Sequence, residues 1–162
     1  MLLDKLRENE LYKELENLVS PLGYHIVDTY KNEKKGETEL TVLVVKKGGD
    51  IALDDLEILY NLIYPRYQAK WDRSLTLEVS SAGMNRNIKD VYEFQLFNGK
   101  DVKVYSNLYS AYVYGKIEEA DDEKVVLSYV SIPDKKITMD KIEMNLSDIQ
   151  KARLEGLEES GK

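Results

Sequence analysis

The hydrophobic pattern of this chain changes near residue 90, and that change restricts the folds that the chain can adopt. Before it, segments of helical and of alternating spacing follow one another, whereas after Asp101 the pattern only alternates. Helical spacing buries one stripe of a helix, and alternation buries one face of a strand. A length of 162 residues allows two small domains. We therefore predict an α+β protein in which an N-terminal α/β domain precedes a small all-β domain.

The first half of the chain predicts the order helix, strand, strand, helix, strand. A stripe of leucines marks a helix over residues 4–22, which Pro21 and Gly23 should end; the stripe is Leu11, Leu15, Leu18 and Leu22. Two β-branched runs, residues 24–30 and 38–47, flank a polar spacer that contains glycine and is typical of a hairpin loop. This order predicts helices packed on one face of a small sheet.

A second helix and a third strand complete the predicted first domain. Asp54, with Glu57 three residues later, resembles the capping box at the start of a helix. The expected inner stripe of this helix is Leu56, Leu59, Tyr60 and Ile63. Pro65 should end or kink it, because proline cannot donate a backbone hydrogen bond. The third strand is predicted over Leu75–Val79.

The second half of the chain predicts strands alone. Four alternating runs follow Asp101, and Gly115 lies inside one of them, where a strongly bent strand would need a glycine. Short strands at this spacing, separated by turn residues, are typical of a small closed barrel. Near residues 149–154 we expect a short turn of helix or a strand.

The two predicted domains meet at a boundary over residues 85–90. The N-terminal α/β domain takes residues 1–86, and the C-terminal barrel takes residues 91–155. Residues 156–162 are predicted to form a polar, disordered tail.

The charge of the chain favours a protein partner over bare nucleic acid. Asp and Glu number 30 against 23 Lys and Arg, the net charge is −7, and neither half of the chain is basic. Proteins that bind bare RNA or DNA usually carry a basic face. An acidic chain suits a basic protein partner. Acidity that only serves solubility is an equal alternative.

The residue types that are missing exclude several classes of site. Cysteine is absent, so neither disulfides nor cysteine-ligated metals can form. Charges interrupt the first ten residues too early for a secretory signal, and no apolar run approaches the ~18 residues of a membrane helix. We expect a cytoplasmic protein without membrane contact, and we expect a monomer.

Candidate catalytic groups are few. The one histidine, His25, starts a predicted strand, and a lone histidine is more often structural than catalytic. A serine hydrolase would need His25 to reach Ser80 or Ser81 across the fold, and the sequence SSAG is not the nucleophile turn of hydrolases. Asp54 and Asp55, followed by Glu57, could ligate a hard cation, but helix capping explains the same residues with fewer assumptions and is favoured. We expect no enzyme activity, cofactor, metal or small-molecule substrate.

Tyrosine is the remaining signal for a binding surface, with 12 tyrosines against two phenylalanines. Four cluster in the second half: Tyr105, Tyr109, Tyr112 and Tyr114. Such rings could stack on bases or anchor a protein interface, although at alternating spacing they are more often half-buried strand residues. The glycine-rich phosphate loops and the GXXG clamp of KH modules do not occur. A general RNA-binding module that uses these tyrosines stays open as an alternative.

One stretch of the chain resembles a family signature. The segment LEVSSAGMNRNIKD is similar to the central signature of the ribosome maturation factor RimP family, which is LEVSSPG, two variable positions and RPL. The matching residues are Leu77, Glu78, Val79, Ser80, Ser81, Gly83 and Arg86. The segments GYHIVD, IALDDLEIL, FNGKDVKV and DIQKARL also resemble family segments, in the same order. Ala82 and Asn87 replace the usual prolines, and Asn85 replaces a common acidic residue, which predicts a less rigid crossing between domains.

The resemblance implies both a fold and a function. The family has an N-terminal α/β domain and a C-terminal SH3-like or Sm-like barrel, and it is implicated in 30S maturation as a non-enzymatic factor on pre-30S particles. The implied partner is the immature small subunit, contacted through basic ribosomal protein with some rRNA contact.

The signature also supplies the candidate site. Ser80, Ser81, Gly83 and Arg86 are expected to form a partner-binding surface or the corner between the two domains. Arg86 would contact a carboxylate or phosphate of the partner, or form a salt bridge that fixes the domains.

Overall fold

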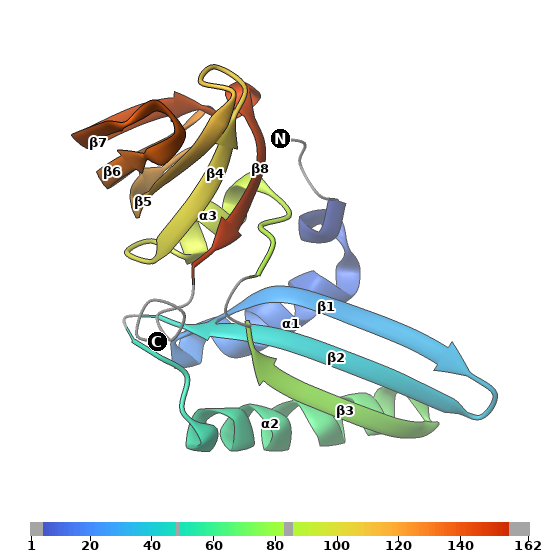
Figure 1. Ribbon diagram of the computed structural model, residues 1–162. Helices are drawn as coiled ribbons and strands as arrows, with labels where there is room; N and C mark the ends of the chain where they lie inside the picture. Colours follow the sequence, from blue (N-terminus) through green and yellow to red (C-terminus); the bar gives the residue numbers. More distant parts are fainter. Residues whose placement is uncertain (1–4, 48, 83–85, 156–162) are drawn as a thin grey trace. The chain divides into compact units, whose positions relative to one another are not determined.

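The structure is a computed structural model that describes residues 5–47, 49–82 and 86–155. Backbone contacts divide the chain into two compact units: Lys5–Ala82, and a second unit that contains the residues after Ala82. The protein is α+β, with a separate sheet in each unit and more strand than helix (Figure 1). None of the helices in the described part of the chain has the length and apolar character needed to cross a membrane.

The first unit has the predicted order of helices and strands. Its elements are η1 (Lys5–Glu8), α1 (Glu10–Val19), η2 (Ser20–Leu22), β1 (Tyr24–Lys34), β2 (Glu37–Lys46), α2 (Leu53–Trp71) and β3 (Ser74–Ser81). The hairpin between β1 and β2 needs only two linking residues, of which Gly36 has φ +74°. The strands therefore run further into the polar spacer than the sequence predicted.

Helix α1 is shorter than predicted and buries a different stripe. The side chain of Asn9 caps it, accepting hydrogen bonds from the backbone nitrogens of Leu11 and Tyr12 at 2.8 and 3.3 Å. The buried residues are Tyr12, Leu15 and Val19. Of the predicted stripe, only Leu15 is fully buried, while Leu22 lies in η2 and is exposed. Leu11 and Leu18 are partly buried against the same core, and Leu22 lies beyond the end of α1 at Val19.

Helix α2 corrects two predictions. Its cap residue is Ala52, not Asp54, and the carboxylate of Asp55 accepts a hydrogen bond from the Ala52 backbone nitrogen at 2.8 Å. Pro65 does not end the helix, which continues to Trp71. Proline removes one hydrogen bond, but the fully buried Ile63 and Tyr67 on either side hold both halves of the helix in the core.

The sheet of the first unit has the order β1-β2-β3. Strands β1 and β2 are antiparallel, whereas β2 and β3 are parallel and are joined through α2. Both helices pack with one face of this sheet in a single core, as predicted. The core is formed by Tyr12, Leu15, Val19, Tyr24, Ile26, Leu40, Val42, Val44, Leu59, Ile63, Tyr67, Leu75 and Leu77.

The second unit combines one short helix with a five-stranded antiparallel sheet. Its elements are α3 (Val91–Leu96), β4 (Asp101–Ser106), β5 (Ala111–Ala120), β6 (Lys124–Ile132), η3 (Pro133–Lys135), β7 (Ile137–Asn145), η4 (Leu146–Asp148) and β8 (Ile149–Leu154). The strand order is β7-β6-β5-β4-β8 (Figure 1). The sequence did not predict α3. A closed barrel is not confirmed, since within the described residues β7 and β8 do not pair and remain the edges of the sheet.

Gly115 lies where the β5–β6 register shifts, between Tyr114 and Lys116. A Cβ on this glycine would lie 3.0 Å from Leu127 Cβ and from the Ser128 backbone oxygen. The close approach of β6 therefore requires a glycine, which confirms the prediction of a special position in β5.

Candidate functional site

The predicted corner starts at the end of β3. Ser80 and Ser81 are its last two residues and pair in parallel with β2. The backbone nitrogen of Ala82 donates a hydrogen bond to the Val44 oxygen at 3.1 Å, so that pairing continues one residue past the strand. Ser80 is half-buried and Ser81 is exposed. Gly83 lies outside the described residues, and its turn conformation stays a prediction.

The structure separates the two serines from His25. His25 lies in β1, the serines lie in β3, and β2 runs between these strands. Two strand spacings amount to about 10 Å, beyond hydrogen-bond reach. His25 Nδ1 instead lies 2.9 Å from Glu16 Oε2, and Glu16 Oε1 accepts a hydrogen bond from the Ile26 backbone nitrogen at 2.8 Å. These contacts tie α1 to β1 and leave the serine–histidine pair of a hydrolase unformed.

Arg86 makes a two-point ion pair with Glu93. Its Nε lies 2.8 Å from Glu93 Oε1, and its Nη2 lies 3.0 Å from Oε2. The Arg86 side chain is 9% exposed and that of Glu93 is 0% exposed. Both partners belong to the second unit. The planar guanidinium matches the carboxylate as anticipated, but the carboxylate comes from α3 of the same unit.

The surroundings of Glu93 fix this pair in place. Glu93 Oε2 also accepts a hydrogen bond from the Lys89 backbone nitrogen at 3.2 Å, and the Asp90 side chain caps α3 by accepting from the Glu93 nitrogen at 3.1 Å. Burial raises the pKa of the Glu93 carboxyl, and the contact with Arg86 opposes that rise. A partner contact through Arg86 stays a prediction, and it would have to compete with this internal pair.

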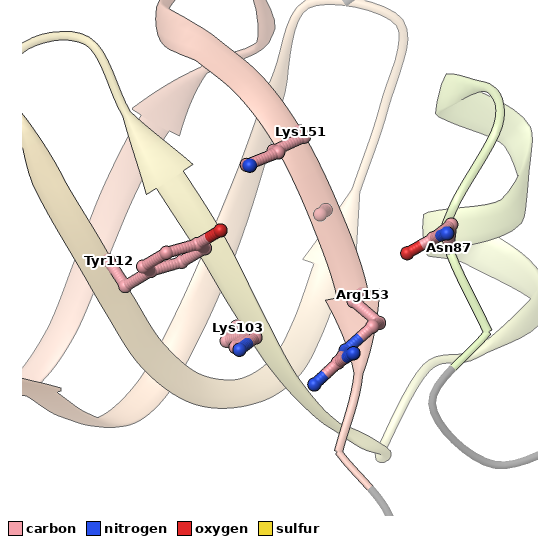
Figure 2. A pocket seen from close by; sticks show the side chains of 6 residues that line it. Asn87, Lys103, Tyr112, Lys151 and Arg153 are labelled. Atoms are coloured by element: carbon pink, nitrogen blue, oxygen red, sulfur yellow. The ribbon is translucent and has the colours of Figure 1, made fainter.

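A pocket of about 170 Å³ lies on the outer face of the second sheet. Its lining is Asn87, Lys103, Tyr112, Lys151, Ala152 and Arg153. Lys103 of β4 is paired in register with Arg153 of the edge strand β8, so the pairing of these neighbouring strands brings the two cations together. Figure 2 shows the labelled side chains of β4, β5 and β8 on the same side of the sheet, with Asn87 beside β8.

Alternation explains why these side chains face outward. The neighbours of Lys103 on β4 and of Arg153 on β8 are buried: Val102, Val104, Ala152 and Leu154. Successive side chains of a strand point to opposite faces, so Lys103, Lys151 and Arg153 share the outer one. The sheet thus presents three cations together on an acidic protein.

Tyr112 is the aromatic centre of the pocket. Lys103 Nζ lies 4.8 Å and Lys151 Nζ 5.7 Å from the centroid of its ring, within cation–π range. The ring of Tyr105 meets it edge-on, with a centroid distance of 5.2 Å and an interplanar angle of 85°. Both tyrosines are half-buried strand residues, as predicted, and neither belongs to the buried core.

The described part of the chain contains no cluster of three or more His, Asp or Glu side chains suited to a metal ion. Asp54 and Asp55 were the acidic residues considered for such a role. Asp55 instead caps α2 and accepts a hydrogen bond from the Tyr24 hydroxyl. Its pKa is lowered, chiefly by this hydrogen bond from Tyr24.

Comparisons with known proteins identify the family. The model of the RimP N-terminal domain matches residues 14–85. A protein named Ribosome maturation factor RimP from Borrelia hermsii is 30% identical over 146 residues, which cover 90% of this chain and 94% of that protein. The chain belongs to the RimP family. Proteins of the same name from Borrelia garinii and Borreliella afzelii are each 28% identical, over 91% of this chain and 95% of their own length.

In this RimP family member, the pocket lies outside the region that the N-terminal domain model matches, because its residues begin at Asn87. The sequence analysis missed Lys103, Lys151 and Arg153. In the sequence, only the lysine and tyrosines at alternate positions of β4 and β5 could have indicated this pocket. The decisive neighbour, β8, lies more than forty residues further along the chain than β4.

Proposed function

We propose that this protein is a ribosome maturation factor that acts as a non-enzymatic binding protein on the immature 30S subunit. The observation that carries the proposal is the similarity along about nine-tenths of both chains to proteins named Ribosome maturation factor RimP. A match of this extent includes both units, so it is more than the sharing of one common domain. We further propose that the second sheet curls as an SH3-like barrel, since the four strands β4 to β7 form one antiparallel meander and β8 extends it beside β4.

The proposed partner is the pre-30S particle. We propose that the protein binds it in the cytoplasm as a monomer. The net charge of −7 supports contact with basic ribosomal proteins, because complementary charge speeds and orients association. Some contact with rRNA is part of the proposal. A general RNA-binding module is not favoured, since the relatives named above are maturation factors by name and match this chain over 94–95% of their own length.

Gradient co-sedimentation tests this function. The purified protein is mixed with mature small subunits, pre-30S particles and large subunits from the same cells, at low and at moderate salt. We expect selective association with pre-30S or free small subunits. Absence of any small-subunit association at either salt, or equal association with large subunits, would contradict the proposal.

An Arg86→Ala variant run in the same gradients tests the predicted corner. Loss of association under conditions in which circular dichroism shows the variant to be folded would support a partner contact at Arg86. Association that persists, or that fails only together with folding, would make Arg86 structural.

A further inference from the structure

The pocket on the outer face of β4, β5 and β8 collects positive charge that the rest of the second unit does not neutralise. Three other lysines of this unit have carboxylate partners: Lys116 with Asp101, Lys124 with Glu143, and Lys141 with Glu118. In contrast, Lys103, Lys151 and Arg153 form no ion pair with any described residue, and no acidic side chain lines the pocket. In a chain of net charge −7, three adjacent cations of this kind require an explanation.

Arg153 adds an independent observation. Its Nε is buried and has no hydrogen-bond partner among the described residues. A buried donor without an acceptor costs free energy, and it means that no internal hydrogen bond at Nε holds the guanidinium in place. Figure 2 shows the Arg153 side chain lying along the pocket on the same side of the sheet as Lys103. The guanidinium therefore has unused capacity to donate where the pocket can receive an anion.

The ring of Tyr112 indicates which class of anion the pocket suits. The ammonium groups of Lys103 and Lys151 lie 4.8 and 5.7 Å from the Tyr112 ring centroid, and the ring offers a π surface that those flexible side chains can uncover. Sites for single-stranded nucleic acid combine a cationic track for phosphates with aromatic rings on which bases stack. A basic ribosomal protein would be repelled by three clustered cations.

We propose that this pocket binds single-stranded RNA, with Lys103, Lys151 and Arg153 contacting backbone phosphates and Tyr112 stacking on a base. The proposal deepens the proposed function, because it places the rRNA contact of the maturation factor on this face. Acidic surface elsewhere is left for basic ribosomal proteins.

Fluorescence anisotropy with a labelled single-stranded oligoribonucleotide tests the site on the full chain. The variant Lys103→Gln/Lys151→Gln/Arg153→Gln removes the three cations. The matched control, Lys124→Gln/Lys135→Gln/Lys141→Gln, removes the same charge from other positions of the same unit. Thermal unfolding is recorded for both variants, to show that each is folded.

We expect the pocket variant to bind at least about tenfold more weakly than the control at about 100 mM salt, because three phosphate contacts are lost. Its log Kd should depend less on log salt, by about 2 in slope. Tyr112→Leu should weaken RNA binding about fivefold or more without changing the salt dependence. Tyr112→Phe, which keeps the aromatic ring, should bind RNA with the affinity of the wild type. If the control loses as much affinity as the pocket variant, or the wild type does not bind RNA, the proposal is overturned.

Two further arms separate this proposal from its alternatives. Polyglutamate of equal charge should compete poorly, and competition as strong as that of unlabelled RNA would make the pocket a general anion site and overturn the RNA assignment. Co-sedimentation with pre-30S particles is measured beside the RNA titration. RNA binding without particle association would uphold the pocket and contradict the maturation-factor function, whereas the reverse would contradict only the pocket.

Discussion

Arg86 and Glu93 form a buried two-point ion pair inside the second unit, with Nε–Oε1 and Nη2–Oε2 distances of 2.8 and 3.0 Å. Arg86 is the arginine of the family signature, and Glu93 lies in the short helix α3. The segment around Arg86 also pairs with β8, since the Arg86 oxygen accepts a hydrogen bond from the Leu154 nitrogen at 2.9 Å. Arg86 thereby fastens both α3 and the edge strand β8.

Replacing Arg86 by alanine should destabilise the protein by about 3–5 kcal/mol, because it leaves the fully buried Glu93 carboxylate without its cation. The cost should grow with pH. Burial already raises the Glu93 pKa, and loss of Arg86 raises it further. A raised pKa means stability that is present at low pH and lost as the pH rises through that pKa. Urea unfolding of both proteins at mildly acidic and at alkaline pH measures this difference.

The double variant Arg86→Met/Glu93→Leu is the control for this pair. It removes both charges together, so it should be much less destabilised than Arg86→Ala. A single variant as stable as the wild type at both pH values would show that the pair contributes nothing to the fold.

Gly115→Ala should destabilise the second unit by about 1–3 kcal/mol, because the new methyl group would meet Leu127 and the Ser128 carbonyl at 3.0 Å. Thermal or urea unfolding measures the change. Gly49→Ala is the matched control, since a Cβ at Gly49 meets nothing within 4 Å. Equal stabilities of the two variants would refute the close approach of β5 and β6.

Tyr129→Asn should stabilise the protein by about 0.5–1 kcal/mol. Tyr129 has φ +52° in β6, a conformation that asparagine tolerates better than an aromatic residue, and its side chain is 81% exposed. Little buried area is therefore lost. Tyr129→Phe, which keeps the strain, should leave the urea midpoint unchanged. A fall in stability for the asparagine variant would mean that the tyrosine ring makes stabilising contacts.

Glu14→Gln should weaken the contact between α1 and α2 by about 0.5–1 kcal/mol at neutral pH. Both Glu14 oxygens lie 2.7 Å from Lys70 Nζ, and Oε1 accepts a hydrogen bond from the Tyr67 hydroxyl at 3.0 Å. These contacts lower the Glu14 pKa, and the hydrogen bond with Lys70 has the largest effect. A lowered pKa gives stability that is present above the unfolded-state value and lost as the pH falls through the folded-state value.

The difference in the free energy of unfolding between wild type and Glu14→Gln should therefore shrink in acid. Urea unfolding at neutral pH and at about pH 3 measures this difference. Glu57→Gln, at an exposed position of α2, removes the same charge and should show a smaller effect. A gap that stays constant across this pH range would exclude the ion pair as its cause.

Hydrophobic periodicity predicted which segments form helices and strands more accurately than it predicted where those segments end. The run after Leu40 was correctly assigned to a strand, and β5 and β6 lie where alternation placed them. Pro65 was misjudged because the local rule ignores the burial of Ile63 and Tyr67. Leu22 was placed in a helical stripe that the chain does not continue. For Pro65, tertiary packing outweighed a local preference, whereas Leu22 lies in the short turn η2, which contains Pro21.

By itself, the sequence determined the order of helices and strands in the first unit, the change to strands after Asp101 and the family signature, because each depends on residues close together in the chain. Only the tertiary structure placed β8 beside β4, and so brought Lys151 and Arg153 to Lys103 and Tyr112. Only the tertiary structure gave Arg86 its partner in Glu93. Hydrogen bonding between distant strands and the burial of a charge pair depend on the folded neighbourhood, which local periodicity does not encode.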